Sequence, residues 1–97
     1  NKGLQWFHFG DIDPDGFLII EHLRNKTGID FKPIYMECEE LERYADYAKP
    51  LEANDIIKAR NMLQKGIYQQ EMEYMLSHNC KLEQEIVSWM RSVKKEF

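Results

Sequence analysis

The chain has 97 residues, of which 43% are hydrophobic and 12% are aromatic. This length suits one small domain, and the apolar content is too high for a disordered tail. The net charge of −4 disfavours a nucleic-acid clamp that binds through charge alone, and no apolar run of about 18 residues could span a membrane. The first residues, Asn1-Lys2-Gly3, show neither an initiator Met nor a signal-peptide pattern. We therefore expect a piece of a longer protein.

Two cysteines, Cys38 and Cys80, stand far apart in the sequence. A secreted disulfide-stapled domain of this size usually carries about four or more, so the expected compartment is a reducing cytoplasm. Zinc sites need close ligand pairs, whereas the nearest approach here is His78-x-Cys80. The spacing therefore predicts thiols that hold no metal.

The first part of the chain has a βαβ pattern. The aromatic run Leu4–Phe9 predicts a strand that is covered on both faces. The next segment predicts a helix over Pro14–Lys26, with Asp13 as its N-terminal cap. A second strand is expected over Lys32–Met36, where Pro33 favours an edge position or the first residue. A helical crossover of this length favours parallel strands in a right-handed unit.

The rest of the chain is predicted to be helical. Apolar residues recur at helical spacing in four segments, which we assign to the core rather than to a cofactor site: Leu41–Ala48, Ile56–Leu63, Tyr68–Leu76 and Leu82–Val93. The predicted stripe of the last segment is Leu82, Ile86, Trp89 and Val93. Residues 1–97 contain no repeat or linker, so we predict one α/β domain or part of one, a short parallel βαβ unit followed by a helical tail.

The most informative segment for chemistry is Gly10-Asp11-Ile12-Asp13-Pro14-Asp15-Gly16, between the first predicted strand and its helix. Two carboxylates separated by one residue can face the same crevice where the backbone turns. In open α/β sheets, ligands bind in the crevice outside the carboxyl ends of the strands. Asp11 and Asp13 are therefore candidate ligands of Mg²⁺ or Mn²⁺, hard ions that prefer oxygen and bind phosphate.

Three other interpretations fit parts of this segment. In an EF-hand, Asp11, Asp13, Asp15 and Gly16 would be the first, third, fifth and sixth loop residues, but a Glu is needed where His22 stands and a helix must enter the loop. In a purely structural interpretation, Asp13 caps the helix and the other two aspartates are solvated turn residues. A receiver-type phospho-acceptor aspartate would need a separate acidic pair and a lysine that the pattern does not supply.

Two strings resemble a known family. The string His8-Phe9-Gly10-Asp11-Ile12-Asp13-Pro14-Asp15-Gly16-Phe17 resembles the DxDxxG motif of toprim domains, which occur in topoisomerases, primases and nucleases. It is most similar to the C-terminal toprim domain of the JetD family, the nuclease subunits of Wadjet anti-plasmid systems, which are related to the A subunit of type VI topoisomerases. Leu82-Glu83-Gln84-Glu85-Ile86 resembles that family's closing Leu-Glu-Gln-Glu segment.

The resemblance implies metal-dependent cleavage of DNA phosphodiesters, with Asp11 and Asp13 as catalytic residues that hold Mg²⁺, or Mn²⁺ in its place. Toprim enzymes have a further Glu on an earlier strand, which has no counterpart here. Residues 1–97 would therefore be the C-terminal half of a toprim domain, a partial toprim (Rossmann-like) fold that supplies half of an active site. The full-length protein would be the Mg²⁺-dependent nuclease, and the chain alone would be inactive. Asp15 lies at a position that varies within the family's motif. Its preferred role is that of a turn residue, and its second candidate role is that of a ligand that binds the metal through water.

Three glutamates are weaker candidates. Glu37 follows the second predicted strand, where the family tends to carry an acidic residue. It could be a carboxylate in the outer shell of the metal site or a solvated Glu at the start of a helix. Glu83 and Glu85 are two residues apart on the predicted last helix and so cannot share a face. Only one of these two could reach the site.

The resemblance also implies partners: DNA, an upstream winged-helix region of the same protein, and SMC-like subunits of a defence complex, with no membrane. The alternative functions are a non-catalytic interaction module that docks through its helical tail, or an EF-hand-like Ca²⁺ binder. A partial sheet leaves open strand edges, which predicts self-association of the chain or modest stability as a monomer.

Overall fold

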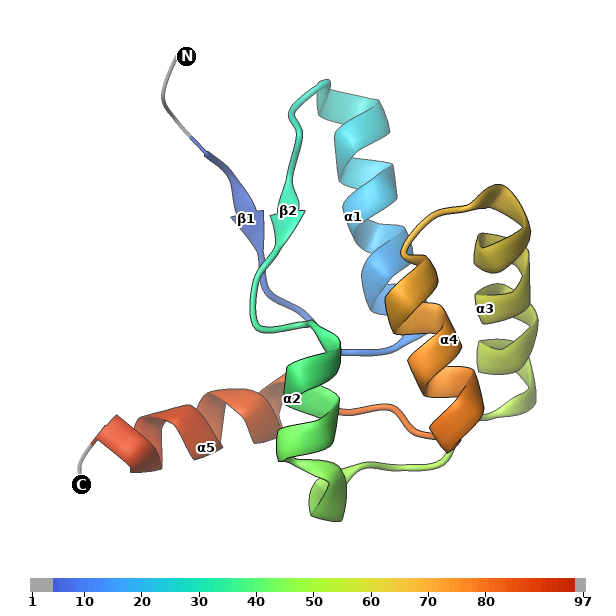
Figure 1. The fold of residues 1–97 in the computed structure, drawn as a ribbon. Coiled ribbons are helices and arrows are strands. Elements are labelled where there is room, and N and C mark those ends of the chain that lie inside the picture. Colours follow the sequence, from blue (N-terminus) through green and yellow to red (C-terminus); the bar gives the residue numbers. More distant parts are fainter. Residues whose placement is uncertain (1–4, 96–97) are drawn as a thin grey trace.

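The computed structural model describes residues 5–95, and these begin with a βαβ unit (Figure 1). The strands β1 (Phe7–His8) and β2 (Lys32–Pro33) pair in parallel as a two-stranded sheet. They are joined by α1 (Pro14–Thr27). The predicted order, helix position and parallel pairing are confirmed, although both strands are shorter than expected.

The ends of α1 are defined by local chemistry. The backbone N–H of Gly16 donates to Oδ1 of Asp13 at 2.6 Å, and Pro14 is the first helical residue. At the other end Gly28 adopts the left-handed conformation with φ 74°, and its N–H donates to the carbonyl of Arg24 at 2.9 Å. The predicted cap at Asp13 is confirmed.

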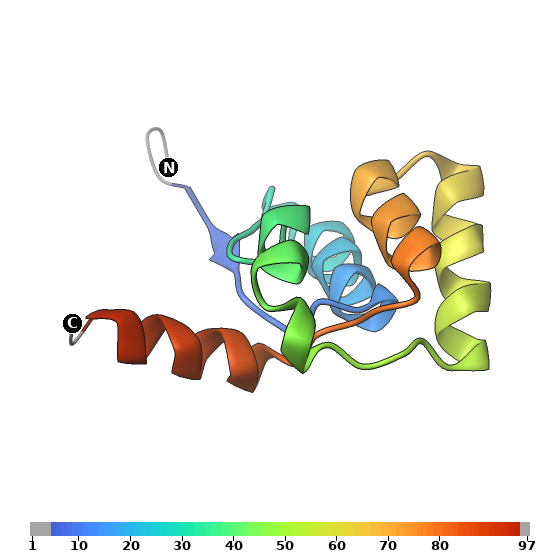
Figure 2. The ribbon, with the colours of Figure 1, turned by 60° about the horizontal axis from the view of Figure 1, so that its bottom comes forward.

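The remaining elements are helical, as predicted, and their bounds are α2 (Cys38–Arg43), the short 3₁₀ helix η1 (Ala45–Tyr47), α3 (Ala53–Lys65), α4 (Gln69–His78) and α5 (Gln84–Lys95). α3 packs against α1 and α4, and α2 packs against α4 (Figure 1). α5 extends away from this body (Figure 2). The structure is therefore mixed α/β and mostly helical. Within the described residues, no helix is long and apolar enough to cross a membrane.

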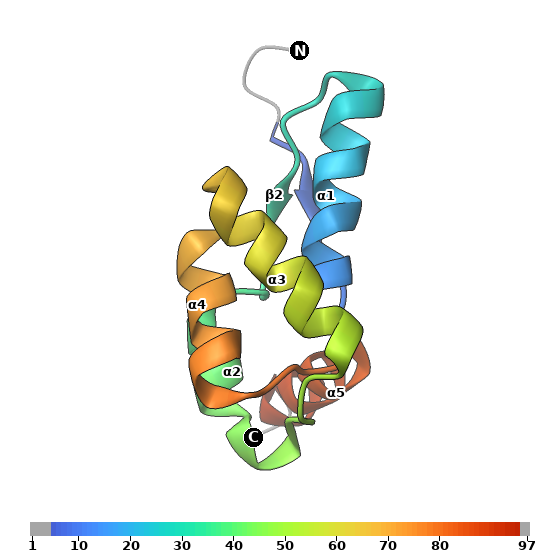
Figure 3. The same ribbon diagram turned by 90° about the vertical axis from the view of Figure 1, so that its right-hand side faces the viewer.

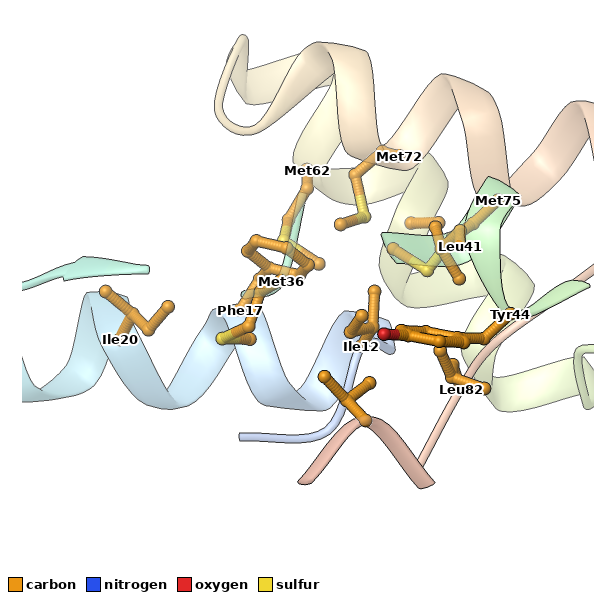
Figure 4. Close-up of a cluster of buried hydrophobic side chains, with 12 residues drawn as sticks. Ile12, Phe17, Ile20, Met36, Leu41, Tyr44, Met62, Met72, Met75 and Leu82 are labelled. Atoms are coloured by element: carbon orange, nitrogen blue, oxygen red, sulfur yellow. The ribbon is translucent and has the colours of Figure 1, made fainter. Parts of the chain in front are cut away.

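One buried cluster joins the βαβ unit to the tail (Figure 4). Its members are Ile12, Phe17, Ile20, Met36, Leu41, Tyr44, Ala59, Met62, Met72, Met75, Leu82 and Val87. Ile12 stands between the two candidate ligands, and its side chain is fully buried. The core therefore holds the DxD segment in place, because moving Ile12 would expose apolar surface to water.

The expected burial of the first strand is wrong for the described residues. Trp6, just before β1, and Phe7, its first residue, are each about half exposed, at 49% and 50%, so the strand is not covered on both faces. Trp6 makes an edge contact with Phe31, with ring centroids 6.2 Å apart, which covers only part of its surface. Leu4, the first residue of the predicted strand, lies outside the described residues.

The helical stripes are only partly as predicted. Met72 and Met75 are buried, but Ile57 is 57% exposed and Trp89 is 61% exposed. In α5 the buried residue is Val87. The prediction took Leu82 as the first inward-facing residue of the helix and placed the others at helical spacing from it. Leu82 instead lies in an extended segment before the helix, so residues at helical spacing from it need not face the core. The side chain of Val93 lies outside the described residues.

Candidate functional site

The DxD segment pairs with a segment far along the chain. The N–H of Ile12 donates to the carbonyl of Leu82 at 2.8 Å, and the N–H of Leu82 donates to the carbonyl of Ile12 at 3.0 Å. Side chains alternate between the two sides of an extended backbone. Because Ile12 and Leu82 both point into the core, Asp11 and Asp13 point the other way, as does Glu83 on the second segment.

These outward side chains meet at a cleft of about 440 Å³. The residues that line it are Asp11, Asp13, Lys49, Pro50, Glu52, Lys81, Leu82 and Glu83. Four of these side chains are carboxylates and two are ammonium groups, so the lining is acidic at neutral pH. The structure thus brings the two predicted ligands together in one cleft at the C-terminal end of β1.

Asp13 is the more buried of the two candidate ligands. Burial raises the pKa of its carboxyl, the hydrogen bond from Gly16 opposes that rise, and the neighbouring charges of Asp11, Asp15 and Asp55 add to it. Repulsion from these other carboxylates therefore destabilises the ionised form of Asp13. A cation placed between Asp13 and Asp11 would relieve that repulsion.

Asp11 is exposed, and one of its oxygens is also engaged. The backbone N–H of Gln84, the first residue of α5, donates to Oδ1 of Asp11 at 2.7 Å. Each aspartate therefore has one oxygen oriented by a backbone N–H, and the other oxygen is left for a ligand. Fixing a carboxylate in this way favours binding, since the group is already positioned.

Three of the described helices, α1, α3 and α5, begin near one another (Figure 3), and residues at or next to their first turns line this cleft. Asp13 caps α1, Glu52 precedes α3, and Asp11 receives the first N–H of α5. Glu52 and Asp55 form a capping box at α3, in which the N–H of Glu52 donates to Oδ2 of Asp55 at 2.9 Å. Helix N-termini carry partial positive charge, which stabilises carboxylates that would otherwise repel one another.

The two lysines of the cleft are held differently. Nζ of Lys81 lies 2.7 Å from Oδ2 of Asp55 and 3.0 Å from Oε2 of Glu52, and its side chain is only 18% exposed. The hydrogen bond to Asp55 raises the pKa of Lys81 despite some burial. Lys49 pairs with Glu83 at the surface, and its side chain is 59% exposed. Lys81 is therefore a structural cation, whereas Lys49 is accessible.

The other predicted site residues lie elsewhere. Asp15 is in the first turn of α1 and pairs with Nζ of Lys58 at 2.6 Å. Glu37 precedes α2, and its side chain makes no capping hydrogen bond there. Glu85 is exposed in the first turn of α5. None of these three is among the residues that line the cleft, and a ligand role for Asp15 or Glu37 stays a prediction.

Glu83 is the residue whose position was predicted wrongly. It does not share a helix with Glu85, because α5 begins at Gln84. Glu83 is extended instead and lines the same cleft as the DxD pair. A signal was present in the sequence, since Glu83 follows a large apolar residue and directly precedes a helix, as Asp13 does in the first motif.

The donor set fits a hard divalent cation better than the alternatives. Mg²⁺ keeps several waters and needs only one or two carboxylates, which Asp11 and Asp13 can supply. Within residues 5–95, no group of three or more His, Cys, Asp or Glu side chains is placed to hold a metal ion, and Cys38 and Cys80 are free thiols. An EF-hand is excluded, since a strand enters the segment and the chain is helical from Pro14.

Comparison with known proteins identifies a family. Residues 2–96 match the model of a family described as Wadjet protein JetD, C-terminal. Neither the curated proteins nor the solved structures give a match to the chain. The family match covers nearly the whole sequence, including both strings that resemble the JetD family. The chain therefore belongs to the JetD C-terminal family, and its role is in Wadjet plasmid defence.

Proposed function

We propose that this chain carries the metal-binding part of a toprim-type nuclease site that cleaves DNA phosphodiesters in the full-length protein. Asp11 and Asp13 would hold Mg²⁺, or Mn²⁺ in its place. The observation that supports this most is the Ile12–Leu82 bridge, which turns both carboxylates into one cleft at the end of a parallel strand. That is the place where ligands of α/β sheets bind.

The residues of the chain would orient the cation. When bound, Mg²⁺ supplies charge that stabilises the phosphate in the transition state and lowers the pKa of a bound water. Asp11 and Asp13 would present one oxygen each, because the N–H groups of Gln84 and Gly16 hold the others. Gly16 allows this packing, since a Cβ on it would lie 1.9 Å from the carbonyl oxygen of Asp11.

The proposal also needs groups from outside this chain. The resemblance to toprim enzymes implies a further acidic residue on an upstream strand, and Glu83 is an additional carboxylate that the chain itself brings to the cleft. The acidic lining leaves DNA to be held by the metal, by an upstream winged-helix region and by other basic surfaces. Other Wadjet subunits, SMC-like proteins among them, are the expected protein partners in a cytoplasmic complex.

The test uses Asp11→Asn, Asp13→Asn and Asp15→Asn in the full-length protein. Asn caps a helix as well as Asp does, so the first two changes remove a negative charge and preserve the helix starts. We expect Asp11→Asn and Asp13→Asn to abolish plasmid cleavage in Mg²⁺, and Asp15→Asn to cost little. Calorimetric titration of Mg²⁺ and Mn²⁺ gives a second readout that does not depend on cleavage, and thermal melts confirm equal folding.

The outcomes separate the remaining functions. Full cleavage by the Asp11 and Asp13 variants would show that the pair is structural and would end the nuclease proposal. A wild-type protein that binds neither Mg²⁺ nor Mn²⁺ would favour the non-catalytic interaction module. One feature supports that alternative: α5 extends away from the rest of the fold (Figure 2), and its residue Trp89 is 61% exposed.

A further inference from the structure

We propose that Lys49 binds a phosphate group of the DNA substrate beside the DxD pair. This inference rests on the proposed nuclease function and assigns a substrate-binding residue to the same cleft. No sequence pattern singled out Lys49, which precedes Pro50 between η1 and α3. Its place in the site follows from tertiary hydrogen bonds.

The backbone of Lys49 is held in register with the DxD segment. The N–H of Lys49 donates to the carbonyl of Lys81 at 2.8 Å, and the reverse bond from Lys81 to Lys49 is also 2.8 Å. Leu82, the next residue, makes the matching pair of bonds with Ile12. Three extended segments thus lie side by side, with Lys49 on one outer segment and Asp11-Ile12-Asp13 on the other. The position of the lysine is set by backbone bonds rather than by a flexible loop.

The side chain of Lys49 is free to change partners. It pairs with Glu83, whose side chain is 47% exposed, and exposed pairs of this kind add little stability. Lys81 is the contrasting case, because it bonds two carboxylates, one of them on the buried Asp55. Withdrawing Lys81 would leave that buried carboxylate without its ammonium partner. Of the two lysines that line the cleft, Lys49 is therefore the one that can turn to a substrate.

The chemistry of the substrate requires such a cation. A phosphodiester is an anion, and the lining of the cleft is itself acidic. Lysine binds phosphate as a compact point charge. In the free protein Glu83 neutralises Lys49, and on binding, the phosphate would take the place of the Glu83 carboxylate. Glu83 would then face the cleft with Asp11 and Asp13, where the positive charge of a bound Mg²⁺ would offset the charge of its carboxylate.

The test compares Lys49→Gln with Lys32→Gln in the full-length protein. Lys32 is a matched control, since its side chain is 57% exposed, pairs with one exposed carboxylate, that of Asp30, and lies outside the cleft. Binding of a fluorescent DNA duplex is measured by anisotropy over a range of salt, in EDTA and in Ca²⁺. We expect Lys49→Gln to weaken binding about fivefold to tenfold and to reduce the salt slope by about 1. Lys32→Gln should match the wild type.

Two further variants define the role. Lys49→Arg keeps the charge and should restore most of the affinity, and Glu83→Gln keeps the lysine and should bind at least as tightly as the wild type. Equal affinity for Lys49→Gln and Lys32→Gln would overturn the inference and leave Lys49 as a partner of Glu83 only. If the wild type fails to cleave DNA while Lys49→Gln still weakens binding, the nuclease proposal fails and the phosphate contact stands.

Discussion

Asp11 accepts a hydrogen bond from the backbone N–H of Gln84 at 2.7 Å, across 73 positions of the sequence. A carboxylate proposed to hold metal therefore also caps the last helix. The amide groups in the first turn of a helix have no partner within the helix, and a side-chain oxygen that accepts from one of them stabilises the fold. The two roles of Asp11 can be separated by choosing the substitution.

The first prediction separates the cap from the charge. Asp11→Ala should lower the free energy of unfolding by about 1 kcal/mol, because α5 loses an oxygen acceptor at its start. Asp11→Asn should stay within about 0.5 kcal/mol of the wild type, since the amide oxygen can accept the same bond. Urea denaturation followed by circular dichroism measures both. Equal losses in the two variants would show that the charge, rather than the cap, stabilises the fold.

The second prediction concerns Gly16. Replacing Gly by Ala inside a helix normally stabilises it by roughly 1 kcal/mol, but here the new Cβ would lie 1.9 Å from the carbonyl oxygen of Asp11. We expect Gly16→Ala to lower the free energy of unfolding by about 1–3 kcal/mol and to weaken Mg²⁺ binding. Gly10→Ala is the control, because its Cβ would meet a side-chain atom, Nε2 of His8, at 2.9 Å, and a side chain can rotate away where a backbone carbonyl cannot. A Gly16→Ala variant more stable than the wild type would contradict this account.

The third prediction is a pH dependence at Asp55. Burial acts to raise the pKa of this carboxyl, but the hydrogen bonds from Lys81 and Glu52 and the charge of Lys58 outweigh burial, so the net pKa is lowered. A carboxyl with a lowered folded pKa stabilises the fold above its unfolded pKa of about 3.9, and this stability is lost as pH falls through the folded pKa.

Asp55→Asn should therefore cost about 2 kcal/mol at pH 7, and this difference from the wild type should shrink below about pH 4. Denaturant unfolding at both pH values provides the measurement. The nearby Asp15, which pairs with Lys58 at 2.6 Å but is exposed, supplies the control, since Asp15→Asn should show a much smaller difference at pH 7. A cost for Asp55→Asn that is constant with pH would contradict the prediction.

The fourth prediction concerns the anchoring of α5. The guanidinium of Arg91 pairs with the buried carboxylate of Glu40 on α2 and lies 3.7 Å from the centre of the Tyr35 ring. Arg91→Met should cost about 3 kcal/mol, because it leaves a buried carboxylate without its closest cation. Arg43 is a weaker partner of Glu40 at 3.8 Å and is 46% exposed, so Arg43→Met should cost less than about 1 kcal/mol. Thermal or urea unfolding measures the loss of stability in both arginine variants. Similar losses would show that the Arg91–Glu40 pair stabilises the fold no more than the Arg43–Glu40 pair does.

The fifth prediction follows from the exposure of Phe7 and the small size of the sheet. Phe7 is 50% exposed on a two-stranded sheet, and unpaired strand edges favour association between chains. We expect the isolated chain to self-associate at high concentration and Phe7→Lys to reduce that association. Sedimentation velocity over a concentration series measures it. A wild-type chain that stays monomeric throughout, with a thermal midpoint typical of complete domains, would contradict the prediction.

The sequence by itself determined the βαβ unit and the two aspartates of the motif. Asp13, Pro14 and Gly28 mark the ends of α1 through local conformational preferences and short-range hydrogen bonds, which a sequence pattern records directly. The parallel pairing of the strands followed from the length of the crossover between them. These features depend on residues close together in the chain.

Only the tertiary structure decided which other residues join the aspartates. Lys49 and Glu83 reach the cleft through backbone bridges between segments far apart in the chain, and no local pattern encodes such pairing. The same bridges explain the error in the last helix. Both backbone hydrogen-bonding groups of Leu82 are taken by Ile12, so the helix cannot include Leu82 and begins at Gln84 instead. In the helix that begins there, Val87 lies in the core and Trp89 is exposed.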